Sequence, residues 1–291
     1  MRTPSKRRSA HLRIDQVERW PPGHYYSPIP DLSEVHRRHS ELFDDLPSAL
    51  PGIELQTEAQ LALLAQLATF LPDMPFTDRA QPDLRYQLEN EFFSHGDALV
   101  LYGMLRLHRP RRYIEIGSGW SSALVLDVRD RFFDGGLSCI FVEPESERLD
   151  SLLKSDDQNS TRIYRQPLQD VWRDVVAQVQ AGDFLFIDST HVGKIGSDVL
   201  IELHEIVPRL PAGVHVHFHD IFFPFQYPPE WVYDGRYWNE TYLLRCLLTD
   251  NRRLRITWWN NYLAKRHKDI VSRLLPGWER NTGGSIWLET S

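Results

Sequence analysis

The sequence predicts an α/β protein built on a parallel sheet with helices on both faces. Two observations carry this prediction. From about residue 90, short apolar runs alternate five times with helical patterns, and several runs are wholly apolar, as in Phe184–Ile187. Strands covered on both faces read in this way, because neither face meets water. The 291 residues are enough for one such domain and an additional segment.

Each element is predicted from its apolar spacing and its flanking turn residues. The five expected strands are 112–117, 138–143, 162–165, 184–187 and 214–218. The expected helices among them are 97–107, 121–132, 146–153, 168–179 and 197–210. The chain then continues with a Pro- and Trp-rich loop at 222–238, a helix at 239–250 and strands at 254–259 and 285–289.

The N-terminal part has a different texture. Residues 1–85 are predicted to form an extension or cap, and residues 86–291 the main domain. Trp20–Pro30 is rich in proline, which disfavours helix in the preceding residues, whereas 56–71 has leucines at helical spacing. The basic first eight residues are not followed by an apolar stretch, so we expect no secretion signal.

Composition argues against several classes of protein. The chain has 33 Lys and Arg against 40 Asp and Glu, a net charge of −7, which is unusual for a nucleic-acid binder. The longest apolar stretch, Leu61–Leu71, is too short to cross a bilayer. Cys139 and Cys246 lie in apolar stretches, so we expect buried, reduced thiols and a cytoplasmic protein.

Polar residues stand at the ends of the predicted strands, although folding does not require them there. In open parallel sheets the ligand lies at the carboxyl ends of the strands. These ends carry Glu115–Gly119, Glu143, Asp188 with His191, and His219 with Asp220. We therefore expect the functional site along this edge of the sheet.

The first two strand ends indicate a nucleoside-containing cofactor. Gly117 and Gly119 allow the backbone to approach a ligand closely, and Glu143 at the next strand end can accept both ribose hydroxyls. A bulkier residue at Gly117 should therefore abolish binding. A nicotinamide dinucleotide favours a third glycine, but Ser122 stands there. Glu115 inside the strand suits a cationic cofactor such as S-adenosylmethionine, directly or through water.

These motifs resemble the class I S-adenosylmethionine-dependent methyltransferases. Residues 186–191, 217–222, 238–240 and 23–28 are more narrowly similar to a bacterial branch of small-molecule and sugar O-methyltransferases. The resemblance implies a Rossmann-like, doubly wound, seven-stranded sheet whose last strand is antiparallel, with the N-terminal extension packed on it. The cofactor-binding residues it implies are Glu115, Gly117, Ser118, Gly119, Glu143 and Asp188, with Leu168 and Gln169 flanking the adenine.

Transfer to an oxygen also requires a group that accepts the proton of the acceptor hydroxyl. The candidate catalytic residues are His219, His191 and Asp188. His215 and His217 share one side of their strand with His219, and we expect them to pack against the neighbouring helix layer. Glu240 is expected to begin a helix that Asn239 caps.

Asp188 and Asp220 end adjacent strands and could hold a divalent metal ion. Some sugar O-methyltransferases of this type bind Mg²⁺ with acids at these strand ends, but they usually follow the second acid with another acid or amide, where this chain has Ile221. A histidine beside these acids would suit Mn²⁺, Fe²⁺ or Zn²⁺ better.

The sequence thus predicts an S-adenosylmethionine-dependent enzyme that O-methylates a small molecule or carbohydrate. Two alternatives stay open: an NAD-dependent oxidoreductase, and a non-catalytic scaffold with this fold in a biosynthetic complex. We expect no nucleic-acid or membrane partner, and a homodimer is a candidate assembly. The aromatic loop 222–238 is expected to stack on the acceptor, to cover the sheet end, or to do both.

Overall fold

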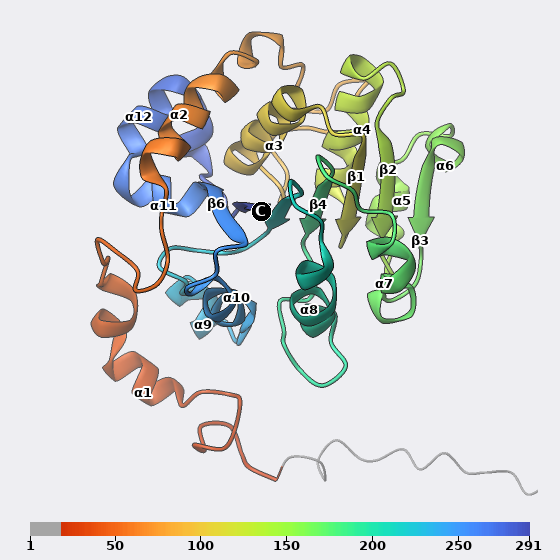
Figure 1. Cartoon of the computed structure of the whole chain (residues 1–291). Coiled ribbons are helices and arrows are strands. Elements are labelled where there is room, and N and C mark those ends of the chain that lie inside the picture. Colours follow the sequence, from red (N-terminus) through yellow and green to blue (C-terminus); the bar gives the residue numbers. More distant parts are fainter. Residues whose placement is uncertain (1–18) are drawn as a thin grey trace, which may run out of the picture. The chain divides into compact units, whose positions relative to one another are not determined.

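The computed structural model describes residues 19–291 (Figure 1). By contact density these residues divide into two compact units. The smaller contains residues 19–45 and Pro229–Tyr237, and the larger contains Leu46–Pro228 and Trp238–Ser291. The boundary expected at residue 85 stays a prediction, although residues 46–85 group with the larger unit. The basic first eight residues lie outside the described part of the chain.

The smaller unit consists of short helices and turns. Helix α1 (Leu32–Arg37) is capped by Asp31, whose side chain accepts hydrogen bonds from the backbone N–H groups of Ser33 and Glu34 at 2.8 and 3.4 Å. Tyr233, at the end of α9 (Pro229–Tyr233), is bonded through its hydroxyl to His39 Nδ1 at 2.9 Å. This bond joins the two stretches of chain that form the unit.

The larger unit is built on one mixed sheet. Within the described residues, seven strands pair in the order β3-β2-β1-β4-β5-β7-β6. Their bounds are β1 Arg112–Ile116, β2 Ser138–Val142, β3 Thr161–Tyr164, β4 Phe184–Ile187, β5 His215–Phe218, β6 Leu254–Trp259 and β7 Ile286–Thr290. The first five strands are parallel, and β7 is antiparallel to both β5 and β6. The predicted fold class is confirmed.

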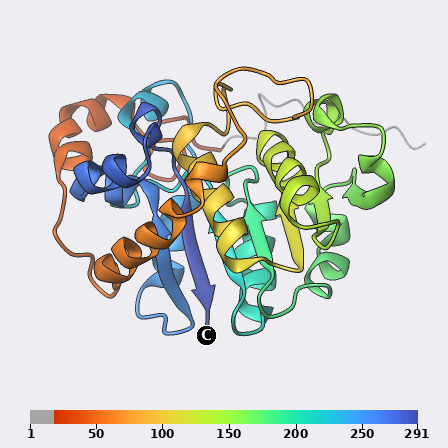
Figure 2. The ribbon, with the colours of Figure 1, turned by 90° about the horizontal axis from the view of Figure 1, so that it is seen from above.

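Helices cover both faces of this sheet (Figures 1 and 2). One layer contains α3 (His95–His108), α4 (Trp120–Phe132) and α5 (Glu147–Leu152), and α2 (Thr57–Ala68) packs on α3 and β6. The other contains α7 (Leu168–Val176), α8 (Asp198–Ile201) and α10 (Glu240–Leu248). Because both faces are covered, β4 and β5 are buried at every position, as their apolar character indicates.

Several predicted elements differ from the structure. The helix expected at 197–210 is α-helical only in α8 and continues as a π-helical stretch (Glu202–Ile206) and a 3₁₀ turn (Val207–Arg209). Pro208 has no N–H group, so it cannot continue an α-helical ladder. Between β6 and β7 the chain also forms α11 (Asn260–Arg266) and α12 (Lys268–Leu274), which were not predicted.

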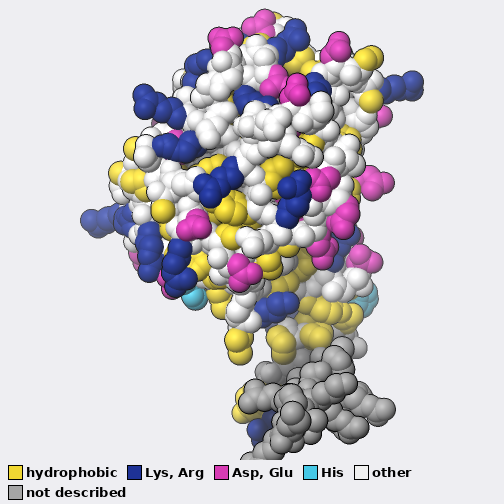
Figure 3. Space-filling view, turned by 90° about the vertical axis from the view of Figure 1, so that its right-hand side faces the viewer, with side chains coloured by type: hydrophobic (Ala, Val, Ile, Leu, Met, Phe, Trp, Pro, Cys, Tyr) yellow, Lys and Arg dark blue, Asp and Glu magenta, His cyan; other side chains and the backbone are white. Residues whose placement is uncertain are grey.

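The expected burial of both thiols is half right. Cys139 in β2 is buried, whereas Cys246 is exposed on α10, because the buried face of this helix is formed by Thr241, Leu244 and Leu248. Among residues 19–291, no helix has both the length and the apolar character needed to cross a membrane. On the face drawn in Figure 3, basic and acidic side chains are interspersed.

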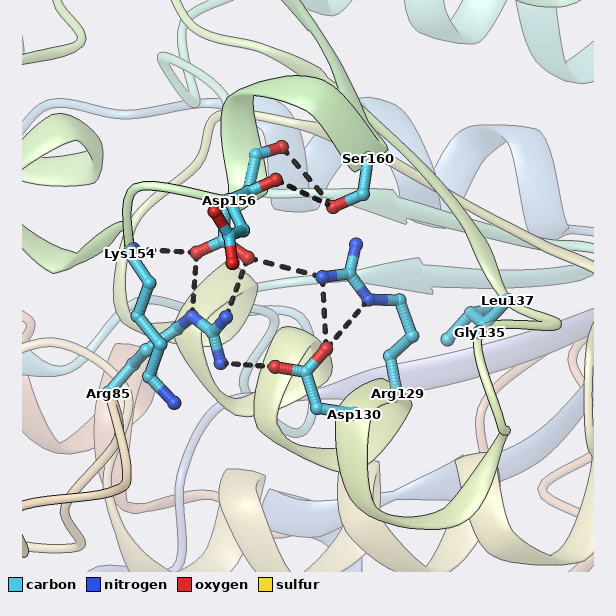
Figure 4. A pocket seen from close by; sticks show the side chains of 9 residues that line it. Arg85, Arg129, Asp130, Gly135, Leu137, Lys154, Asp156 and Ser160 are labelled. Carbon is cyan, nitrogen blue, oxygen red and sulfur yellow. Dashed lines mark hydrogen bonds and ion pairs between the residues drawn. The ribbon is translucent and has the colours of Figure 1, made fainter.

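A buried ion network anchors the segment before α3 to the helices near β3. Arg85 Nη1 lies 2.7 Å from Asp127 Oδ1 of α4, and Nη2 lies 2.6 Å from Asp157 Oδ1 of α6 (Asp157–Ser160). All three side chains are at most 3% exposed. Figure 4 shows Arg85 and Arg129 both directed at Asp130, beside a cavity of about 390 Å³. None of the predicted site residues lines this cavity, so we assign the network a structural role.

Replacing Arg85 with Met should lower the free energy of unfolding by about 3 kcal/mol. The buried Asp127 would keep only Lys154 Nζ at 3.9 Å as a counter-ion, and Asp157 would keep only Arg129 at 3.1 Å. Urea unfolding followed by circular dichroism measures this loss. Arg165→Met is the matched control, since its ion pair with Asp150 has side chains 43% and 39% exposed and should contribute about 1 kcal/mol or less. Equal losses in the two variants would refute the structural role of the buried network.

Candidate active site

The predicted site residues meet along one edge of the sheet, because the strand ends are in register. Ile116 at the end of β1 pairs with Val142 of β2 and Ile187 of β4, and Ile187 pairs with Phe218 of β5. The residues that follow these strands therefore emerge side by side. They are Gly117, Glu143, Asp188 and His219.

The glycine turn after β1 is explained first by packing against the neighbouring strand. Gly117 has φ +79°, and a Cβ there would lie 1.7 Å from the carbonyl oxygen of Asp188. A side chain there would first collide with the end of β4, and the close approach of a ligand to Gly117 stays a prediction. Gly119 differs: its φ of 175° is ordinary extended backbone, and a Cβ there would meet the side chain of Arg148, with Cδ nearest at 3.2 Å.

Glu143 and the glycine turn are bonded to each other. Glu143 Oε2 accepts a hydrogen bond from the backbone N–H of Ser118 at 2.9 Å, and Oε1 accepts one from Glu145 N–H at 2.8 Å. The carboxylate is half-buried. A carboxylate has about four lone-pair positions, so each oxygen keeps capacity to accept a hydroxyl of a ligand.

Glu115 stabilises the glycine turn through hydrogen bonds to the start of α4. It is fully buried in β1, and its two oxygens accept hydrogen bonds from the hydroxyls of Ser121 and Ser122 at the start of α4. Ser122 Oγ in turn accepts a bond from the backbone N–H of Gly119 at 3.0 Å. Burial raises the pKa of Glu115 to about 8, although the two hydroxyls act in the opposite direction. Its effect on a ligand is therefore transmitted through the turn.

The two residues expected beside an adenine lie at the start of α7. Leu168 is buried in the core, and Gln169 is exposed and donates a hydrogen bond to the carbonyl of Gly196 at 2.9 Å. Gln169 thereby contacts the loop that follows β4. Their contact with an adenine stays a prediction.

A cluster of two acids and a histidine lies after β4 and β5. His191 Nε2 is 3.4 Å from Asp188 Oδ1 and 3.6 Å from Asp220 Oδ2. One ligand atom from each of these residues can be chosen so that all lie within 4.8 Å of one another. The carboxylates of Asp188 and Asp220 are 33% and 17% exposed, whereas His191 is 7% exposed. The two carboxylates are therefore the solvent-accessible part of the cluster, and the imidazole is buried behind them.

Glu240 fixes the other side of the His191 ring. Its Oε2 lies 2.8 Å from His191 Nδ1, and its side chain is 1% exposed. The ring of Trp238 packs on the imidazole with centroids 4.5 Å apart. The backbone carbonyl of His191 accepts bonds from the N–H groups of Asn239 and Glu240 at 3.0 and 3.1 Å. The histidine is thus held through both its ring and its backbone.

Helix α10 begins at Glu240 with Asn239 as its N-cap residue, as predicted, but the expected capping by the side chain is absent. Asn239 makes no side-chain capping bond, because its amide instead pairs with the backbone of Gly193, accepting at 2.6 Å and donating at 3.2 Å. The Glu240 side chain turns inward to His191. Sequence reasoning missed this partner because the two residues are 49 positions apart and no motif joins them.

The backbone at the cluster adopts a conformation that most side chains avoid. His191 has φ +59° and Asp220 has φ +56°. The left-handed region costs a residue other than glycine about 1–2 kcal/mol. Such outliers persist only where the surroundings over-determine them, and they concentrate at functional sites. Seven residues other than glycine have positive φ in the described part of the chain, and two of them belong to this one cluster.

The charges of the cluster affect one another. Burial lowers the pKa of His191, but Asp188 and Glu240 outweigh it and hold the pKa well above its ordinary value. Burial raises the pKa of Asp188, but the nearby His219 and His191 bring it below its ordinary value. Burial keeps the pKa of Asp220 raised. Asp188 is therefore an ionised carboxylate that is accessible to solvent.

The three histidines of β5 have different surroundings. His215 packs against His108 of α3 at 4.1 Å between ring centroids, as expected for the helix layer. His217 instead stacks on Phe186 of the sheet at 3.7 Å, and its Nε2 is bonded to Ser285 Oγ. His219 reaches the cluster, with Nε2 3.6 Å from Asp220 Oδ1 and with Nδ1 buried without a hydrogen-bond partner among the described residues.

The aromatic loop after β5 is packed rather than open in its first part. Phe223, Phe225 and Tyr227 are at most 2% exposed. Phe223 and Phe225 pack on the ring of Trp259 at 5.4 and 4.7 Å. This part covers the end of the sheet, and stacking on an acceptor stays a prediction for the remaining aromatics.

Comparison with known proteins identifies a domain that spans the site. Residues 114–221, from β1 to just past Asp220, match the family model of a methyltransferase domain. A curated protein of Archaeoglobus fulgidus, described only as uncharacterized, is 34% identical over 128 residues, which are 43% of this chain and 58% of that protein. The match thus spans little more than half of that relative's length.

Solved structures that match the chain include three methyltransferases. The first is an SAH-bound methyltransferase of Podospora anserina, with 12% identity, coverage of 91% of this chain and 99% of that chain, and a TM-score of 0.43. The second is an O-methyltransferase of Streptomyces achromogenes involved in tomaymycin synthesis. It has 14% identity, coverage of 90% of this chain and 96% of that chain, and a TM-score of 0.43. The third is an O-methyltransferase of Bacillus cereus. It has 12% identity, coverage of 89% of this chain and 97% of that chain, and a TM-score of 0.41. These identities and TM-scores are low.

Gly117→Ala should prevent folding or strongly lower the melting temperature, because its Cβ would overlap the backbone of Asp188. Gly119→Ala should fold normally, since its extended backbone suits any residue and a flexible arginine side chain can move away. Soluble yield and thermal unfolding compare the two. A Gly117→Ala protein with the wild-type melting temperature would contradict the packing explanation.

Glu115 predicts a pH-dependent stability. Its pKa rises from 4.5 to about 8 on folding, so between these values the folded state binds more protons than the unfolded state. The free energy of unfolding should therefore fall as the pH rises through this window, and Glu115→Gln should reduce that slope. Urea unfolding at a series of pH values measures it. The exposed Glu279→Gln should keep the wild-type slope, and an equal slope in Glu115→Gln would exclude Glu115 as its source.

Proposed function

We propose that this chain, whose residues 114–221 match the family model of a methyltransferase domain, transfers the methyl group of S-adenosylmethionine to a hydroxyl of a small molecule or carbohydrate. When bound, S-adenosylmethionine supplies an already activated methyl group. The chain therefore has to hold the cofactor, align the acceptor oxygen and receive its proton.

One observation carries the cofactor assignment: Glu143 is bonded to the backbone of the glycine turn at Ser118. The bond fixes a two-oxygen acceptor beside backbone that has no side chain at Gly117 or Gly119. A ribose with two hydroxyls fits such an acceptor, and the bare turn lets the rest of the nucleoside approach. Gly117, Ser118, Gly119 and Glu143 are the residues we assign to the cofactor, with Glu115 positioning them.

The polar cluster after β4 and β5 is the proposed acceptor side. Asp188 is ionised and the most exposed of its members, so it can accept a hydrogen bond from an acceptor hydroxyl. His191 has both ring nitrogens beside carboxylates. His219 has one nitrogen, Nε2, at the cluster, 3.6 Å from Asp220 Oδ1, whereas its Nδ1 is buried. We therefore assign the proton-accepting role to His219, with Asp188 holding the hydroxyl.

The donor set also suits a divalent ion. Asp188 and Asp220 offer carboxylate oxygens and His191 an imidazole nitrogen, and the three can approach a common centre. A bound dication lowers the pKa of a hydroxyl that it contacts and so favours loss of its proton. We propose Asp188 and Asp220 as the carboxylates that would hold it.

Two other functions remain as alternatives. An NAD-dependent oxidoreductase would use the same glycine turn, but Ser122 is committed to the N–H of Gly119 where a third glycine would stand. A scaffold protein would keep the fold without binding a cofactor. We also propose that the acceptor carries a hydroxyl and that the protein is cytoplasmic and forms a homodimer. We propose no nucleic-acid or membrane partner.

Calorimetric titration tests the proposal. S-Adenosylmethionine and S-adenosylhomocysteine should bind, and NAD should not. Glu143→Gln should weaken binding about 10-fold or more, because hydrogen bonds to a charged group contribute about 1.5–3 kcal/mol. Glu279→Gln, an exposed site with the same change of charge, should bind like the wild type. Binding of NAD alone would favour the oxidoreductase, and absence of any binding the scaffold.

A further inference from the structure

The spacing around His191 is longer than a hydrogen bond and matches that of ligands around one ion. Nitrogen–oxygen hydrogen bonds cluster at about 2.7–3.2 Å. His191 Nε2 lies 3.4 and 3.6 Å from the nearest oxygens of Asp188 and Asp220. Two ligands of a tetrahedral ion, each about 2.1 Å from it, lie about 3.4 Å apart. The imidazole is therefore placed as a third ligand would be.

The environment of the opposite ring nitrogen supports the same assignment. A histidine that binds a metal usually gives its other ring N–H to a carboxylate, which fixes the tautomer and orients the ring. Glu240 Oε2 occupies that position at 2.8 Å from Nδ1, and Trp238 packs on the ring. With Nδ1–H donated to Glu240, a dication that displaces the proton of Nε2 would meet a nitrogen lone pair directed at the two aspartates.

One side of the cluster is accessible to solvent, and the other is buried. His191 and Glu240 are 7% and 1% exposed, so they form the back of the site. Asp188, at 33%, lies at the opening. Catalytic metal sites keep such an open position for water or substrate, whereas structural sites are closed by four protein ligands.

The identity of the donors selects the class of ion. Mg²⁺ takes oxygen ligands and retains several waters. Imidazole nitrogen with carboxylate oxygens suits Mn²⁺, Fe²⁺, Co²⁺ or Zn²⁺, and affinity for such sites rises from Mn²⁺ through Fe²⁺ to Co²⁺. One nitrogen in three protein ligands is therefore enough to shift the preference away from Mg²⁺.

We propose that Asp188, His191 and Asp220 form a mixed nitrogen–oxygen site for a transition-metal dication, and that Glu240 is the positioning residue that orients His191. The inference deepens the proposed function by naming the ion its acceptor side takes. The ion binds to this cluster whether or not the cofactor is present.

Cobalt provides a direct readout, because Co²⁺ bound to a nitrogen–oxygen site absorbs visible light in proportion to occupancy. Protein stripped with EDTA should bind one Co²⁺, and Mg²⁺ should displace it only at a concentration about 100-fold higher or more. His191→Asn should weaken Co²⁺ binding about 100-fold, and Glu240→Gln about 10–100-fold. His204→Asn, an exposed histidine outside the cluster, should match the wild type.

Three results would overturn the inference: no Co²⁺ binding, equal competition by Mg²⁺, or wild-type Co²⁺ affinity in folded His191→Asn. If His191→Asn does not fold, X-ray absorption of the wild-type Co²⁺ protein decides, since a bound imidazole gives its own scattering pattern and an all-oxygen shell does not. The titration uses no cofactor and no turnover. Co²⁺ binding without S-adenosylmethionine binding would therefore refute the proposed function and leave the metal site standing.

Discussion

The close approach of the β1 turn to the end of β4 is the constraint on which the site depends. Only hydrogen at the α-carbon of Gly117 allows the carbonyl of Asp188 to lie where a Cβ would come within 1.7 Å. This contact brings Glu143 and the glycine turn beside Asp188 and its neighbours. The two halves of the proposed site, one for a nucleoside and one for an acceptor, are joined through this backbone contact.

The site concentrates ionisable groups that are removed from water. Glu115, Glu240, His191 and His219 are all at most 6% exposed. Burying charges usually destabilises a protein unless each is paired, and a well-packed apolar residue often does as well or better. Arg85 and its acids satisfy that requirement through complete pairing, but Glu240 Oε1 and His219 Nδ1 are buried without a partner among the described residues. Unpaired groups of this kind beside His191 and Asp220 are better explained by chemistry than by stability.

The sequence predicts the sheet well because its signal is local. Apolar runs such as Phe184–Ile187 leave little choice but a buried strand, and strand ends in register bring Glu143, Asp188 and Asp220 to one edge. The partner of His191 could not be predicted in this way, since Glu240 reaches it only through the folding of the loop after β4. The packing of Gly117 could not be predicted either, because its neighbour is the backbone of Asp188, 71 positions later in the chain. Contacts that depend on how loops close or how backbones pack join residues at no regular sequence spacing, so a sequence pattern does not predict them.

The different surroundings of the two cysteines make α10 accessible to a chemical label. Cys139 is buried in β2, and burial raises the pKa of its thiol to about 12, so it reacts slowly at neutral pH. Cys246 is exposed on the helix that begins with Glu240. A thiol-reactive fluorophore would therefore attach to one position without mutagenesis. Its emission would report on the helix behind His191 while ligands bind on the other side of that ring.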